Sequence, residues 1–191
     1  MASRFLNFAI PALGLAVLAS VATFKSTAIA LTPISPPPLP TATAEGYSRY
    51  TLSGQYSIDF LSGAYLTQNS SGYLMISNYF PETGRCCFEP GEVKTDAYTL
   101  EESFEDAAAA IATDMGGLAG EFVRQERFFI NGRRAARSWW TNGDNGADSA
   151  LTVVQVSDTQ TARINSFYSL GDNITVETIE SIHSSFRVLN R

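Results

Sequence analysis

Residues 121–141 read EFVRQERFFINGRRAARSWWT, and this stretch decides the fold. Two β-prone segments, residues 121–130 and 133–141, stand on either side of Asn131-Gly132. Both central positions of a type I′ turn need positive φ, which Asn and Gly adopt most readily. The stretch therefore predicts an antiparallel hairpin with a two-residue loop.

Further strands are indicated on both sides of this hairpin. Residues 55–60 (QYSIDF) alternate polar and apolar side chains, as a half-buried strand does. The remaining β-rich segments are residues 72–80, which end at Pro81, residues 93–100, and a second hairpin formed by residues 150–157 and 160–169.

Two segments have the 3.6-residue period of amphipathic helices. Thr175 is the expected N-cap of the second helix, and either Thr99 to Glu102 or Ser103 to Asp106 is expected to cap the first. Hairpins dominate and strands do not alternate with helices, so the sequence predicts an α+β sandwich of helices on a largely antiparallel sheet. The two apolar stripes are Phe104, Ala107, Ala108, Ile111 and Met115, and Val176, Ile179, Ile182 and Phe186.

Residues 1–30 have the features of a cleavable secretory signal. Arg4 precedes an apolar run, and the small-x-small pattern ends at Ala30. The alternative is an uncleaved N-terminal anchor. We expect a Pro-rich linker over residues 31–46, which contains five prolines, and a single domain over residues 47–191.

The charge of the chain excludes some partners. Residues 1–30 hold two basic residues, Arg4 and Lys25, and no acidic residue, so the remainder has 11 basic and 19 acidic residues and a net charge of −8. Nucleic acids and anionic lipid surfaces repel such a protein. We expect neither as a partner, and no membrane insertion of the cleaved chain.

The residue types present do not support a catalytic centre. His183 is the only histidine, and it projects toward the apolar stripe of the last helix, which indicates a packed residue. One histidine and two adjacent cysteines exclude a three-histidine zinc site. Because the one histidine is expected to be packed, we expect no Ser-His-Asp triad either. We therefore expect no catalytic residues and no enzyme activity.

Cys86 and Cys87 are adjacent and leave several interpretations open. A disulfide between neighbouring residues is strained and easily reduced, which is typical of a redox switch. The alternatives are two thiols in a loop, or pairing between chains.

Residues 142–148 (NGDNGAD) are rich in oxygen ligands and suggest calcium. In the EF-hand template, however, the sixth position would be Ala147 rather than Gly and the twelfth Val153 rather than Glu. A polar connection between strands accounts for the segment better, and weak binding of a divalent ion stays open.

The first hairpin is the candidate partner-binding element. It holds five of the 11 basic residues in 14 positions, and Arg and Trp are enriched at protein interfaces. With the two-residue loop, Glu126 lies opposite Arg137, and one tryptophan is expected against a helix with the other nearer the rim. The alternative is a solvated hairpin with its tryptophans in the core. The candidate residues are Arg124, Arg127, Arg133, Arg134, Arg137, Trp139 and Trp140.

Taken together, residues 47–189 resemble the PsbP family, the extrinsic lumenal proteins of photosystem II and their PsbP-like relatives. The segments that carry the resemblance are Tyr56 to Phe60 (YSIDF), Arg133 to Trp140 (RRAARSWW), Ile179 to Val188 (IESIHSSFRV), Lys94-Thr95-Asp96 and Ser103-Phe104-Glu105.

The resemblance implies an antiparallel sheet sandwiched between helices, and a location in the thylakoid lumen or the periplasm. It implies a non-enzymatic peripheral subunit or assembly factor of photosystem II, with Ca²⁺ as a cofactor of the oxygen-evolving site. The alternatives are a periplasmic binding module of the same fold, unrelated to photosynthesis, and a thiol-dependent enzyme acting through Cys86.

Overall fold

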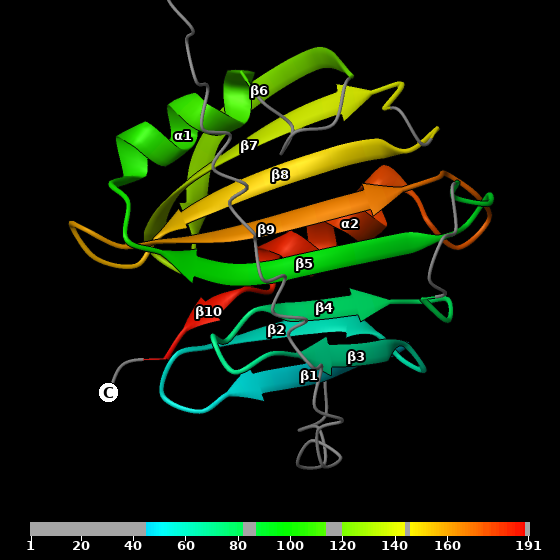
Figure 1. Ribbon diagram of the computed structural model, residues 1–191, viewed down its shortest axis with the longest axis horizontal. Helices are drawn as coiled ribbons and strands as arrows, with labels where there is room; N and C mark the ends of the chain where they lie inside the picture. The colour runs from blue at the N-terminus through cyan, green and yellow to red at the C-terminus, as the bar shows by residue number, and fades with distance from the viewer. Residues whose placement is uncertain (1–44, 82–86, 114–119, 144–145, 190–191) are drawn as a thin grey trace, which may run out of the picture. The chain divides into compact units, whose positions relative to one another are not determined.

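The computed structural model describes residues 45–81, 87–113, 120–143 and 146–189 (Figure 1). The predicted signal segment, residues 1–30, and nearly all of the linker lie outside these ranges. The elements run in the order β1 (Tyr47–Leu52), β2 (Tyr56–Leu61), β3 (Tyr65–Gln68), β4 (Leu74–Ser77), β5 (Val93–Leu100), α1 (Phe104–Thr113), β6 (Glu121–Ile130), β7 (Arg133–Thr141), β8 (Asp148–Gln155), β9 (Thr161–Tyr168), α2 (Val176–Ser184) and β10 (Arg187–Val188).

The strands form two antiparallel sheets. The larger sheet has the order β3-β4-β5-β9-β8-β7-β6, and the smaller has the order β1-β2-β10. Every neighbouring pair in the large sheet is antiparallel, and β6 to β9 follow one another as a meander. The predicted α+β class with an antiparallel sheet is confirmed.

The helices cover opposite faces of the large sheet, with α1 in front and α2 behind in Figure 1. Alternation along β8 supplies both cores. Leu151 and Val153 pack with α1, whereas Ala150 packs with Ile179 of α2. Ile179 is fully buried, and burying such a side chain contributes about 1.5–3 kcal/mol. Burial of the two helix stripes therefore holds the three layers together.

Side chains cap both helices as their sequences predict. The hydroxyl of Thr175 accepts a hydrogen bond from the Thr178 backbone N–H, and the Thr178 side chain completes a capping box. At α1, the Ser103 hydroxyl accepts from the Asp106 N–H at 3.2 Å, which selects Ser103 over Thr99 as the cap. Met115, expected on the α1 stripe, lies outside the described residues.

The turn of the first hairpin has the conformation that its sequence requires. Asn131 has φ 49° and Gly132 has φ 77°, both in the left-handed region. The strands are the predicted ones, and Glu126 lies opposite Arg137. A bulge between Phe122 and Arg124 shifts the register near the other end of β6.

Three strands were not expected, and two predicted elements are shorter than the pattern suggested. β1, β3 and β10 have six, four and two residues, and β4 occupies only part of residues 72–80. The last helix ends at Ser184, so Phe186 leaves it and stacks on Tyr56 with ring centroids 5.2 Å apart. Within the described ranges, neither helix has the length and apolar composition to cross a membrane.

Candidate interaction site

The seven candidate residues of the hairpin are not gathered on one surface. Because side chains alternate along a strand, the hairpin presents three of them on each side of the sheet, and the seventh lies beside the turn. The side that carries α1 receives Arg127, Arg134 and Trp140, and the side that carries α2 receives Arg124, Arg137 and Trp139. Arg133 lies next to the turn and donates to the carbonyl oxygens of Gln155 and Val156.

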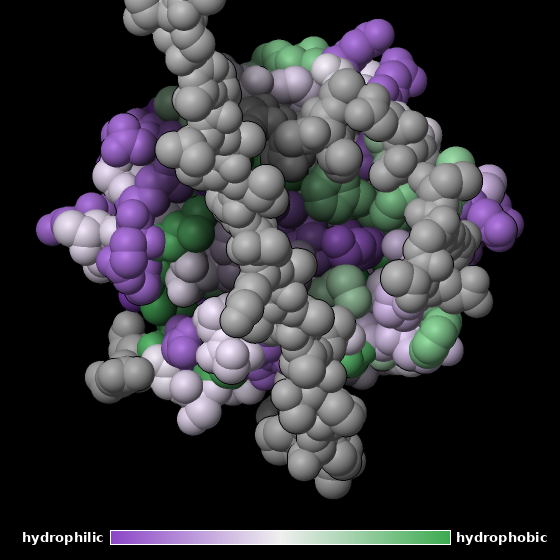
Figure 2. Space-filling view, in the orientation of Figure 1, coloured by the Kyte–Doolittle hydropathy of each residue, from purple (hydrophilic) through white to green (hydrophobic). Residues whose placement is uncertain are grey.

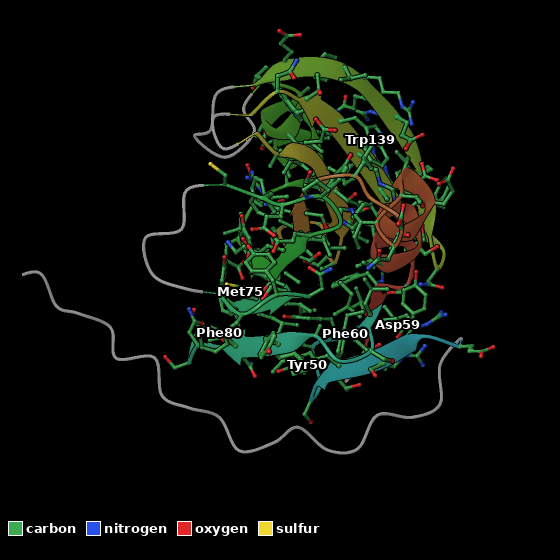
Figure 3. All side chains as sticks on the ribbon, turned by 90° about the vertical axis from the view of Figure 1, so that its right-hand side faces the viewer. Tyr50, Asp59, Phe60, Met75, Phe80 and Trp139 are labelled. Atoms are coloured by element: carbon green, nitrogen blue, oxygen red, sulfur yellow. The ribbon has the colours of Figure 1, made fainter. Side chains whose placement is uncertain are left out.

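Both tryptophans are buried, although one was expected near the rim. Trp139 is 5% exposed and Trp140 is 8% exposed. Trp140 donates through Nε1 to the Ile111 carbonyl of α1 at 3.2 Å, whereas Trp139 lies on the α2 side of the sheet (Figure 3). The two indole rings therefore attach the helices to the sheet.

Arg137 is the most buried arginine of the hairpin, at 3% exposure. Its Nε donates to Thr152 Oγ1 at 3.0 Å, and its Nη1 lies 3.5 Å from Glu126 and 3.7 Å from Glu180. Burial lowers the pKa of the guanidinium, and the charges of Glu126 and Glu180 oppose that shift. Its cation also lies over the Phe128 ring. Arg137 of β7 thus contacts β6, β8 and α2 from a buried position.

A chain of hydrogen bonds continues from Arg137 across the interior. His183 contacts Thr152 Oγ1 through Nδ1 at 2.7 Å and Ser166 Oγ through Nε2 at 2.8 Å. Ser166 is bonded in turn to Thr95 at 2.7 Å. Burial, and secondarily the charge of Arg137, hold the pKa of His183 well below its usual 6.5, so the ring is neutral. The prediction that His183 is a packed residue is confirmed.

Ser166 and His183 lie at the distance of a nucleophile and its base. Both residues are 0% exposed, however, and their surroundings are side chains of the core. A substrate cannot reach the serine hydroxyl in this arrangement. The pair serves as a connection between β9 and α2.

An exposed cluster of two arginines and one glutamate lies on the α1 side of the hairpin. Arg127 Nη1 lies 2.9 Å from Glu105 Oε2, and Arg134 binds the other oxygen of the same carboxylate. Hydrogen bonds from both arginines lower the pKa of Glu105. Both guanidinium groups lie over the Phe104 ring, at 5.8 and 4.5 Å from its centroid. Beside them Phe129 is 72% exposed.

Other predicted sites fall partly outside the described ranges. Cys87 is exposed, whereas Cys86 is not described, so their pairing stays a prediction. Asp144 and Asn145 of the calcium-like segment are also not described. Among the described residues, no three His, Cys, Asp or Glu side chains come together to hold a metal ion, and binding of a divalent ion by residues 142–148 stays a prediction.

Comparison with known proteins gives a match in structure but none in sequence. No family model and no curated protein sequence match this chain. The solution structure of cyanobacterial PsbP (CyanoP) from Synechocystis sp. PCC 6803 is similar, with a TM-score of 0.52, 12% identity, and coverage of 78% of this chain and 97% of that chain. The chain has the PsbP-like fold.

The PsbP-like fold confirms the resemblance inferred from the sequence at the level of architecture. A crystal structure from Bacteroides thetaiotaomicron VPI-5482 also matches, with a TM-score of 0.34 and 12% identity over 73% of this chain and 47% of that chain. At 12% identity, functional residues of these proteins cannot be assigned to positions of this chain.

Sequence reasoning missed two groups of functional or structural residues. Glu105 and Phe129 complete the exposed α1 side of the hairpin, and Thr95, Thr152 and Ser166 form the buried chain with His183. Hydroxyl residues in otherwise apolar strands were a usable signal, because a buried hydroxyl needs a partner. The adjacent Phe128 and Phe129 were another, since they must face opposite sides.

Proposed function

We propose that this chain is an exported, non-enzymatic subunit or assembly factor that binds the lumenal side of photosystem II. The observation that carries the proposal is the PsbP-like fold, which spans 97% of cyanobacterial PsbP. The sequence resemblance supports it independently, because it was drawn from residue patterns.

The distribution of side chains agrees with a binding role. The histidine and the hydroxyls near it are enclosed in the core, whereas arginine and phenylalanine side chains stand exposed on the hairpin. These exposed side chains are available for contact with a partner protein. The net charge of the chain, −6 for the full sequence and −8 after the predicted cleavage, favours a protein partner over an anionic lipid surface.

Co-purification tests this function. The tagged full-length chain is expressed in its native organism, and photosystem II membranes are isolated and washed with increasing salt. We expect the chain to stay with these membranes at low salt and to be released at high salt, as a peripheral subunit is. Recovery only as a free protein of the periplasm would favour the periplasmic binding module instead.

A further inference from the structure

The α1 side of the β6–β7 hairpin has a small cleft at its exposed end. The cleft measures about 190 Å³, and it is lined by Phe104, Arg127, Phe128, Phe129, Arg134 and Ala135. We call these residues, together with Glu105, the hairpin rim. Figure 2 views the face of the sheet that carries α1, where hydrophilic and hydrophobic surface lie side by side.

The hairpin rim has an apolar part that the fold leaves uncovered. Phe129 is 72% exposed, the largest exposed fraction among the large apolar side chains of the described residues. β6 is the last strand of the large sheet, so no further strand of the described chain lies beyond it. Aromatic side chains next to a cleft are typical anchors of protein interfaces.

The hairpin rim also has more positive than negative charge. Arg127 and Arg134 share the single carboxylate of Glu105, in a chain that is acidic overall. The side chains of Arg127, Glu105 and Arg134 are 55%, 55% and 46% exposed. Each guanidinium has five N–H donors, and each uses one of them on Glu105. A second carboxylate can therefore bind the pair without displacing Glu105.

We infer that the hairpin rim binds a protein segment in which an aliphatic or aromatic side chain stands next to a carboxylate. The apolar side chain enters the cleft beside Phe129, and the carboxylate accepts hydrogen bonds from Arg127 and Arg134. This inference rests on the proposed function, because it names the chemistry by which that binding surface recognises its partner. The α2 side does not offer the same pair of exposed arginines beside an exposed phenylalanine, since Arg137 and Trp139 are buried there and Arg124 stands exposed without Arg137.

The first test uses the full-length chain and a defined probe. The probe is acetyl-Gly-Leu-Glu-Phe-Asp-Leu-Gly-amide, and its twin carries Gln and Asn at the two acidic positions. We expect NMR shifts at Phe104, Arg127, Phe129 and Arg134, and binding of the twin at least about tenfold weaker. Equal binding of both peptides, or shifts confined to other surfaces, would overturn the inference.

Variants identify the side chains responsible. Arg127→Glu combined with Arg134→Glu should weaken binding of the acidic peptide at least about tenfold, and Phe129→Ala should do so about tenfold. Arg124→Glu is the control, because it makes one of these charge reversals on the opposite side of β6 and should alter binding less than twofold. Equal losses in the control would refute the assignment. If the double variant folds poorly, Phe129→Ala decides the test, provided that its thermal unfolding is the same as that of the wild type.

The second test separates the inference from the proposed function. If wild type stays on photosystem II membranes and the double variant is released, both stand. If both proteins stay equally, the function stands and the hairpin rim is not the contact. If wild type is not retained, the proposed function fails and the peptide titration alone decides the inference. Self-association of the free chain, or binding to anionic vesicles that Arg127 and Arg134 mediate, would overturn it.

Discussion

His183 Nδ1 lies 2.7 Å from Thr152 Oγ1, which joins the last helix to the centre of the large sheet. The same hydroxyl accepts from Arg137 Nε at 3.0 Å, so one oxygen connects α2, β8 and β7. None of these three residues is more than 3% exposed. The polar chain is therefore a structural element of the core, and its removal has measurable consequences.

His183→Ala should lower the free energy of unfolding by about 2–4 kcal/mol. The change leaves a cavity and removes a hydrogen-bond partner from each of two buried hydroxyls. Urea unfolding followed by circular dichroism measures it. Ser184→Ala, at the exposed neighbouring position, should change stability by less than about 0.5 kcal/mol. A loss no larger than that control would contradict a structural role for the ring.

Stability should fall with pH below about 6.5 because of the same residue. In the folded protein the pKa of His183 lies well below 6.5, whereas in the unfolded chain it returns to that value. Between the two pKa values only the unfolded chain binds the proton, so the contribution is complete above pH 6.5 and is lost as the pH falls. The slope approaches at most about 1.4 kcal/mol per pH unit.

Urea midpoints between pH 8 and pH 5 measure this dependence, and His183→Gln should flatten it. The lowered pKa of Glu105 acts in a separate window, because stability from that carboxylate is lost only as the pH falls below 4.5. An unchanged slope in the glutamine variant would show that His183 is not the titrating group.

Trp140→Phe should destabilise the protein more than Trp139→Phe. The Trp140 Nε1 donates to the Ile111 carbonyl within the α1 interface, and losing it leaves a buried oxygen without that donor, at about 1–2 kcal/mol. The Trp139 Nε1 instead donates to Glu126, whose carboxylate is partly exposed and can bind water. Thermal unfolding by circular dichroism compares the two. Equal losses would contradict this division of roles.

Asn131→Ala should loosen the C-terminal segment as well as the hairpin turn. The Asn131 amide donates to the Phe186 carbonyl at 2.7 Å and its oxygen accepts from Arg187 at 2.5 Å. We expect a loss of about 1–2 kcal/mol and faster hydrogen exchange in β2 and β10. Asn142→Ala is the control, because Asn142 also has positive φ, 55°, but follows the end of β7 opposite to the Asn131-Gly132 turn. Equal acceleration in both variants would contradict the role of the amide.

The sequence predicted the parts of the fold whose information is local. Asn131-Gly132 determined the hairpin and its register, and Thr175 determined the start of α2. β10 was missed because two residues form a strand only through their pairing with Ser57 and Tyr56 of β2. That pairing joins segments more than 100 residues apart, and no local pattern encodes it.

The candidate site was predicted in composition but not in arrangement. The five arginines were identified as a group, yet strand alternation assigns Arg127 and Arg134 to one face and Arg137 to the other. Glu105, their shared partner, comes from α1, and only the packing of α1 on the meander brings it there. Phe129 is exposed, whereas Phe128 packs against the core. The sequence could not show which of the two would be exposed, because this depends on how the layers pack together.

Two strand pairings, β2 with β10 and β5 with β9, join the first half of the domain to its final third. A chain that emerges from a ribosome or an export pore with its N-terminus first thus lacks the partners that complete both sheets until nearly all of it has passed. The native pairing of both sheets can therefore be completed only late. The order in which residues become available thereby sets the earliest moment at which both native sheets can be completed.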